Sequence, residues 1–319
     1  MFKQSSKFIL TLLVFFCKLK CSLCSLGDSF PYYRTCVSEC SRSICDEDGY
    51  HKKERSPSYF EEMFEWQCTS ECRYVCMWDL VEAFERKGWN VPQFHGKWPF
   101  VRWWGLQEPV SMIASVIHLL VTIYMFRYFY KRVCSKSPMY WIWVTYAVVL
   151  MNCWTWSALF HARDLPFNEI MDYISAFAAI LFGFFAIGYR VLLNSPSRIL
   201  FSICCLLYFL NHTLYRTLDE NFDYAYNMKA NIVLSIMTSI IIFAWTIREW
   251  KNLYHVRYAL YYMINFMIAA IPEILDFPPI LWLVDAHALW HILSIPVTYF
   301  LFMYGVEDCR YLHRSKLHL

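Results

Sequence analysis

Seven apolar segments, each long enough to cross a bilayer as a helix, constrain this chain more than any other feature. A helix needs roughly 20 mostly apolar residues to span the hydrocarbon core. The composition agrees, because 58% of the residues are hydrophobic and only 17% are charged, as is typical of a polytopic membrane protein. We therefore predict an all-α bundle of seven transmembrane helices near 109–126, 139–160, 173–193, 199–215, 230–247, 258–275 and 283–304.

Basic residues predict how this bundle is oriented. Loops on the cytosolic side of a membrane carry an excess of lysine and arginine. With a luminal N-terminus, only Arg163, Arg216 and Lys229 fall on the luminal side after the first span. Twelve fall on the cytosolic side: Arg127, Lys131, Arg132, Lys136, Arg190, Arg198, Arg248, Lys251, Arg257, Arg310, Arg314 and Lys316. This bias predicts a luminal N-terminus and a cytosolic C-terminus. The net charge of +3 is too small to indicate nucleic acid as a partner.

The N-terminal third has a different character. Residues 1–25 resemble a signal peptide, because Lys3 and Lys7 precede a short apolar run; an uncleaved anchor is the alternative. Residues 26–107 are predicted to form a cysteine-rich luminal domain. The domains that follow are a seven-helix domain over 108–305 and a cytosolic tail over 306–319.

Six cysteines lie in the luminal segment: Cys36, Cys40, Cys45, Cys68, Cys72 and Cys76. An even set behind a signal sequence predicts three disulfides in an oxidising compartment, with the pairing left open. A zinc ribbon is the alternative, but the segment lacks the tight CxxC pairs of such sites.

Five polar residues fall at one depth of the predicted bundle, at the luminal ends of three helices. Ser157 and His161 end the second span, Asp172 opens the third, and His287 and His291 open the seventh. Ionisable groups inside a membrane are costly and usually face the bundle interior. Both pairs at i and i+4 share one helical face, and Asp172 can fold back toward His161 across the turn that contains Pro166.

Three histidines with one open position are typical of a catalytic zinc site. A water in that position would be activated by the metal. Asp172 could orient or deprotonate that water, and Ser157 could hydrogen-bond to the water or to a developing oxyanion. The alternative for each HxxxH pair is a polar contact within the bundle, without metal. Glu273, Asp276 and Asp285 are interpreted as loop or helix-capping groups, with a role in the site as the alternative, and His118 and His255 as structural or surface residues.

Longer motifs resemble a known family, the post-GPI-attachment lipid-remodelling proteins. They are "YRTCVSEC" (33–40), "CRYVCMW" (72–78), "VPQFHGKWPF" (91–100), "EPVS" (108–111), "WSALFHARD" (156–164), "MDY" (171–173) and "LDFPPILWLVDAHALWHILSIPV" (275–297). The resemblance covers residues 27 to 310 or so. It places the chain in the CREST superfamily of seven-helix membrane hydrolases, alongside alkaline ceramidases.

The resemblance implies a zinc site with His161, His287 and His291 as ligands, and with Asp172 and Ser157 as catalytic residues. It implies hydrolysis of the sn-2 acyl ester of GPI-anchored proteins, a phospholipase A2-type reaction that precedes reacylation with a saturated chain. The expected location is the Golgi membrane, with the endoplasmic reticulum as the alternative. One departure is Asn168, where a threonine is expected. The alternative functions are a ceramidase-like membrane amidase and a non-enzymatic seven-helix receptor or remodelling cofactor.

Overall fold

A computed structural model describes residues 26–52, 59–64, 66–218 and 224–317. The segment predicted as a signal peptide lies outside these residues. Within them the chain is helical, with isolated β-bridges and no strand. The chain divides into two compact units, one up to Pro99 and one from Phe100 onward.

The first unit is a helical hairpin stapled by disulfides. Its helices are α2 (Leu26–Ser29), α3 (Pro31–Ile44), α4 (Tyr59–Met63) and α5 (Cys68–Arg86). Three disulfides join α3, and the residue that follows it, to α5: Cys36–Cys76, Cys40–Cys72 and Cys45–Cys68. In each of the two segments the cysteines recur about every four residues, so their sulfurs lie on one helical face. The first cysteine of α3 pairs with the last of α5, which means that the two helices are antiparallel. The prediction of three disulfides is confirmed.

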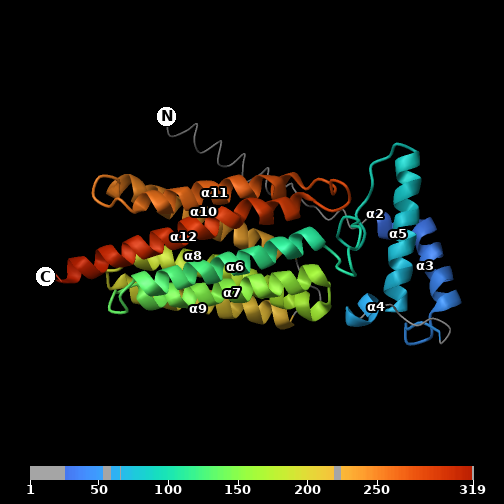
Figure 1. Ribbon diagram of the computed structural model, residues 1–319, viewed down its shortest axis with the longest axis horizontal. Helices are drawn as coiled ribbons and strands as arrows, with labels where there is room; N and C mark the ends of the chain where they lie inside the picture. The colour runs from blue at the N-terminus through green and yellow to red at the C-terminus, as the bar shows by residue number, and fades with distance from the viewer. Residues whose placement is uncertain (1–25, 53–58, 65, 219–223, 318–319) are drawn as a thin grey trace. The chain divides into compact units, whose positions relative to one another are not determined.

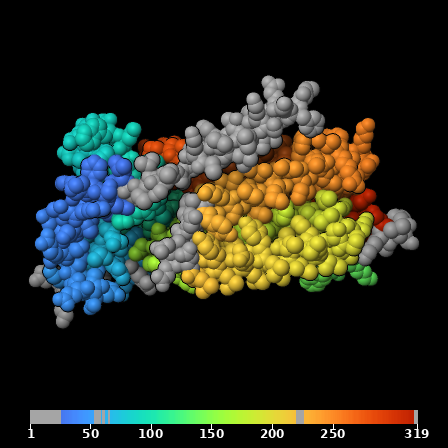
Figure 2. Space-filling view, turned by 180° about the vertical axis from the view of Figure 1, so that it is seen from behind, coloured from blue at the N-terminus to red at the C-terminus, as the bar shows by residue number. Residues whose placement is uncertain are grey.

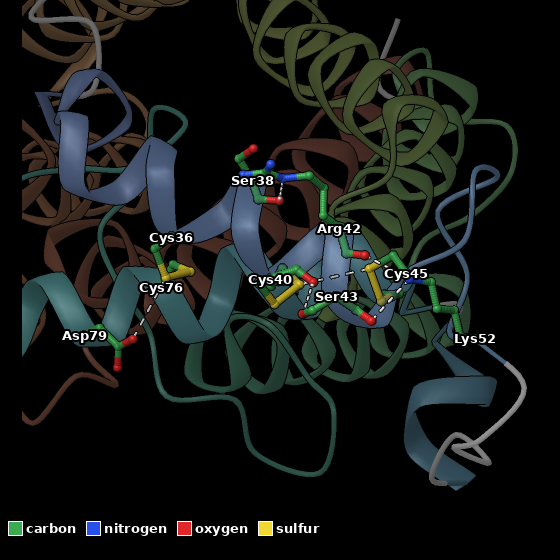
Figure 3. The surroundings of a disulfide bond; sticks show 11 residues. Cys36, Ser38, Cys40, Arg42, Ser43, Cys45, Lys52, Cys76 and Asp79 are labelled. Carbon is green, nitrogen blue, oxygen red and sulfur yellow. Dashed lines mark hydrogen bonds between the residues drawn. A yellow bond between two sulfur atoms is a disulfide. The ribbon is translucent and has the colours of Figure 1, made fainter.

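The end of α3 has its own cap, which Figure 3 shows beside the disulfides. The last carbonyl groups of a helix have no partner within the helix. Here the Lys52 ammonium group donates to the carbonyl oxygens of Arg42 at 2.8 Å and Ser43 at 3.2 Å. The cation also lies at the negative end of the helix dipole, which is favourable.

The second unit holds seven long apolar helices, counted over the described residues, which confirms the predicted fold class. They are α6 (Pro109–Arg132), α7 (Tyr140–Ala162), α8 (Pro166–Val191), α9 (Ser197–Leu218), α10 (Tyr224–Glu249), α11 (Val256–Leu275) and α12 (Ala286–Leu317). The third helix begins seven residues before its predicted start. Pro166, which we expected in the preceding turn, is the first helical residue, where a proline costs no hydrogen bond.

Six of these helices close a ring. α6 packs on α7, α7 on α8, α8 on α10, α10 on α11, α11 on α12, and α12 on α6 again. Helix α9 packs on α8 outside the ring and is mostly exposed along its length; it is the yellow helix on the face shown in Figure 2. Its large exposed apolar side chains are leucines and isoleucines together with Tyr215, as expected against lipid.

The Trp143 side chain of α7 reaches the backbone of α12 at a glycine. A Cβ atom added to Gly305 of α12 would lie 2.7–2.9 Å from the buried Trp143 ring of α7. Only a glycine lets the indole lie flat against the helix backbone at this point. Because α12 carries two of the predicted site histidines and α7 carries the third, this contact helps to set the spacing between them.

Candidate functional site

The three predicted histidines meet at one end of the bundle. His161 lies in the last turn of α7, and His287 and His291 lie in the first two turns of α12. The Nε2 atom of His291 is 3.2 Å from Nε2 of His161 and 3.1 Å from Nε2 of His287. One ring nitrogen from each histidine falls within 4.8 Å of the other two. The i and i+4 spacing on α12 therefore does bring both imidazoles to one point.

Two of these histidines each contact a carboxylate, which fixes the tautomer of the imidazole ring. Nδ1 of His161 is 2.7 Å from a carboxylate oxygen of Glu108, and Nδ1 of His287 is 3.0 Å from one of Glu273. A carboxylate accepts, so each Nδ1 carries the proton and donates it. In the neutral ring the Nε2 lone pair then points into the cluster.

These lone pairs are what a metal ion would bind. His291 Nε2 faces two other Nε2 atoms and could donate one proton to only one of them. Ligand nitrogens at 2.0–2.1 Å in a tetrahedral site lie about 3.3 Å apart, close to the 3.1 and 3.2 Å separations here. The donor set and its spacing thus fit a metal ion bound by three histidines.

Glu108 holds His161 by both its ring and its backbone. Glu108 precedes α6, and its backbone N–H donates to the His161 carbonyl at 3.0 Å while its carboxylate receives the ring proton. The N–H of Gln107 donates to the carbonyl of Ala162, also at 3.0 Å. Both Glu108 and His161 are buried. The start of α6 is therefore bonded directly onto the end of α7, which fixes the ring.

The third histidine is positioned through its backbone instead. Nε2 of His118, in the middle of α6, donates to the His291 carbonyl at 2.9 Å, and Ser294 Oγ lies 3.1 Å from the same nitrogen. The His118 ring stacks on Trp154 of α7 with 3.7 Å between centroids. Nδ1 of His291 is buried and has no hydrogen-bond partner among the described residues. His118 thus has the structural role we predicted.

Ser157 lies one turn before His161 on the same face of α7 and is buried. Its Oγ is 3.0 Å from Oγ of Ser115, and the single hydroxyl proton of Ser115 goes to the Ser111 carbonyl at 2.9 Å. Ser157 must therefore donate its own proton to Ser115. What Ser157 can still offer to a ligand is a lone pair.

Because α8 begins at Pro166, Asp172 lies in the second turn of this helix. Its side chain is half-buried. Its backbone carbonyl accepts a hydrogen bond from Ser175 at 3.0 Å, and its carboxylate interacts electrostatically with Cys153. Cys153 precedes Ser157 by one turn of α7. The histidine cluster itself comprises His161, His287 and His291 and does not include Asp172. The loop before it is held by Asn168, whose amide donates to the Arg163 carbonyl at 3.0 Å.

Two acidic residues near the cluster are helix caps, as predicted. Asp285 accepts a hydrogen bond from the Ala288 N–H at 2.7 Å at the start of α12. Burial raises the pKa of Asp285 to about 6, although the nearby His287 imidazole and this N–H act in the opposite direction. Asp276 ends α11 in the left-handed conformation, with φ 43°.

The sequence interpretation missed the two carboxylates that hold the histidine rings. Glu273 was grouped with the capping residues, and Glu108 was quoted only as part of "EPVS". A glutamate immediately before a helix looks like a loop residue unless its distant partner is known. Their roles depend on contacts across 53 and 14 residues of sequence.

Comparison with known proteins places this arrangement in a family. The sequence model of the Per1-like family matches residues 58–309. The chain belongs to the Per1-like family. It is 37% identical over 282 residues to "Post-GPI attachment to proteins factor 3" of Drosophila melanogaster, covering 86% of each chain. It is 38% identical over 295 residues to "GPI-specific phospholipase A2-like PGAP3" of Mus musculus, covering 92% of each.

A Homo sapiens relative of the same name is 37% identical over 295 residues, with 92% of each chain covered. No solved structure matches this chain. These relatives confirm the resemblance that the sequence motifs indicated.

Proposed function

We propose that this chain hydrolyses the sn-2 acyl ester of the lipid that anchors GPI-linked proteins, releasing a fatty acid and leaving a lyso-GPI for reacylation. The observation that carries this proposal is the convergence of three histidine Nε2 atoms, at 3.1 and 3.2 Å, in a Per1-like chain. Several relatives are named as GPI-specific phospholipase A2-like. The substrates would be GPI-anchored proteins, met within the plane of the membrane.

His161, His287 and His291 would hold the metal, and zinc fits this donor set. Imidazole is a common zinc ligand, and three protein ligands with one open position are typical of catalytic zinc. When bound, zinc would supply Lewis-acid activation of water and of the ester carbonyl. Glu108 and Glu273 would keep the rings in the tautomer that points Nε2 inward.

Asp172 and Ser157 would handle the attacking water. Asp172 would accept its proton as the water oxygen bonds to the ester carbon, and would return that proton to the glycerol oxygen as the ester C–O bond breaks. Ser157, with its proton committed to Ser115, would accept a hydrogen bond from the water. Of its two predicted roles we therefore favour orienting the water over stabilising the oxyanion.

The depth of the cluster suits an ester substrate. The histidines lie in terminal turns of α7 and α12, and the ester of a glycerolipid lies just below the headgroups. We propose that this end is luminal, because the GPI glycan and its protein are luminal. The proposed location is the Golgi membrane, with the endoplasmic reticulum as the alternative, after removal of a signal peptide over residues 1–25.

The test is mass spectrometry of GPI anchors from cells that lack this protein. Rescue with the wild-type chain should restore saturated anchors, whereas His291→Ala should leave unsaturated ones. His313→Ala is the matched control, because His313 lies near the other end of α12 and should rescue fully. Equal rescue by His291→Ala would rule out the metal-dependent reaction.

A second assay separates an enzyme from a cofactor. Purified wild-type protein should contain about one zinc per chain by elemental analysis and should release fatty acid from a purified GPI. It should leave the amide of ceramide intact. Cleavage of ceramide instead would favour the membrane amidase, and bound zinc without cleavage of either lipid would favour the non-enzymatic alternative.

A further inference from the structure

A cavity lies at the opposite end of the bundle from the histidines. It has a volume of about 490 Å³ and lies at the end of α10, in the turn toward α11. Helix α10 is antiparallel to α11, which is antiparallel to α12, so the end of α10 lies far from the first turns of α12. The cavity is therefore separate from the candidate metal site, and the proposed hydrolysis leaves it without a role.

The lining changes from apolar to cationic along the helix axis. Phe243, Thr246, Ile247 and Trp250 line the cavity and follow the i, i+3, i+4, i+7 spacing of one helical stripe. Phe243 and Ile247 are exposed, as they would be against lipid chains. From Phe243 to the end of the cavity at Lys251, the stripe rises about 12 Å, roughly the depth from upper acyl chain to headgroup.

Positive charge gathers at the outer end of this stripe. Arg248 and Lys251 line the cavity, and the Arg257 guanidinium lies 5.0 Å from the ring of Trp250, which also lines it. The nearby acid is Glu249, which already pairs with Arg248 at 3.0 Å and accepts a hydrogen bond from Asn252 at 3.3 Å. Three cations against one engaged carboxylate leave a net positive site.

Thr246 in the cavity lining, and Arg257 beside the lining residue Trp250, each have a polar atom without a partner among the described residues. Thr246 is 3% exposed, and its Oγ has no hydrogen bond among the described residues. The Nε of Arg257 is likewise buried and without a bond. A buried hydroxyl or guanidinium N–H without a partner is costly. The Thr246 hydroxyl can donate, and an anionic oxygen in the cavity that it lines would accept its proton.

We propose that this cavity binds the phosphate headgroup of an anionic glycerophospholipid from the leaflet on that side of the membrane. The phosphate would lie among Arg248, Lys251 and the Thr246 hydroxyl, and one acyl chain would run along Phe243 and Ile247. The apolar stripe favours a lipid over a free anion, because it can contact an acyl chain. The net positive charge favours an anionic lipid over a zwitterionic one.

The test measures lipid binding to the full-length chain in neutral detergent by native mass spectrometry. Short-chain phosphatidylserine should bind at one site more tightly than phosphatidylcholine of the same chain length. Arg248→Ala with Lys251→Ala should weaken this binding about 30-fold. Lys131→Ala with Lys136→Ala, which removes two exposed positive charges near the end of α6, should weaken it less than about threefold.

An isosteric pair tests the hydroxyl separately. Thr246→Val should weaken phosphatidylserine binding about fivefold, while Thr238→Val, whose hydroxyl donates to Leu234 on the same helix, should leave it unchanged. If the two double alanine variants weakened phosphatidylserine binding equally, general surface charge would account for the binding and this cavity would not. Displacement of the lipid by equimolar inorganic phosphate, or equal affinity for phosphatidylcholine, would also overturn the proposal.

Discussion

Replacing Glu108 by glutamine tests the geometry of the metal site more sharply than removing a ligand does. Glutamine keeps the shape of the side chain and an oxygen that accepts the His161 Nδ1 proton, but it removes the negative charge. The contact at 2.7 Å is buried, with side chains 2% exposed for His161 and 7% for Glu108. A hydrogen bond to a charged group is worth about 1–2 kcal/mol more than a neutral one. Zinc affinity should therefore fall about 5- to 30-fold.

The same change at Glu273 supplies an internal comparison. Its contact with His287 is longer, at 3.0 Å, and the side chains are 39% exposed for His287 and 25% for Glu273. Water screens such a pair, so its charge contributes about 0.5 kcal/mol or less. Glu273→Gln should weaken zinc binding only about twofold.

The assay is a competition between the purified protein and a fluorescent zinc chelator, with zinc content checked by elemental analysis. Both variants should fold, because neither glutamine creates a cavity. The burial of the two pairs predicts a clear order, with Glu108→Gln the weaker binder. If both variants bound zinc as tightly as the wild type, or if Glu273→Gln were the weaker binder, the proposed role of these carboxylates would be wrong.

Three further predictions test the roles of Ser157, His118 and Asp308, the first and the last with a comparison variant. Ser157→Ala should lower hydrolysis of GPI about 100-fold, whereas Ser115→Ala should change the rate less than about threefold, because only the first removes the lone pair offered to water. His118→Phe keeps the stacked ring but loses the bond to the backbone of the third histidine, and should cost about 1–3 kcal/mol in unfolding free energy, measured by thermal denaturation. Asp308→Asn should cost about 3–5 kcal/mol because it leaves buried Arg190 without its charge partner; Asp308→Leu with Arg190→Met should cost less.

Sequence reasoning found the three histidines that cluster in the structure because the evidence for them is local. His287 and His291 are four apart on one helix, and the depth of His161 followed from counting spans. Hydropathy located the seven helices for the same reason. It misplaced the start of the third, because Pro166 looks the same in a turn and in the first position of a helix.

The sequence did not predict the two carboxylates that hold the histidine rings, or the disulfide pairing, because both depend on tertiary contacts. Glu108 reaches a histidine 53 residues away, and nothing in "EPVS" indicates which helix end it will face. The pairing of Cys36 with Cys76 requires α3 and α5 to be antiparallel, and spacing alone allows other registers. Contacts that cross between helices follow from packing, which a single sequence does not specify residue by residue.

Charge balance explains why two of the three histidines have a carboxylate and the third does not. A divalent ion held by neutral imidazoles adds two positive charges to a site in which His161 and His291 are buried, and burying uncompensated charge is costly. Glu108 and Glu273 supply two negative charges through the rings of His161 and His287. A third carboxylate on His291 would make the cluster more negative, and among the described residues its Nδ1 has no hydrogen-bond partner. Asp285 adds a further negative charge, which is offset by its place at the positive end of α12, where it accepts the Ala288 N–H. In the proposed metal site these charges would suit a divalent ion such as Zn²⁺ better than a monovalent ion such as Cu⁺, even though imidazole binds both.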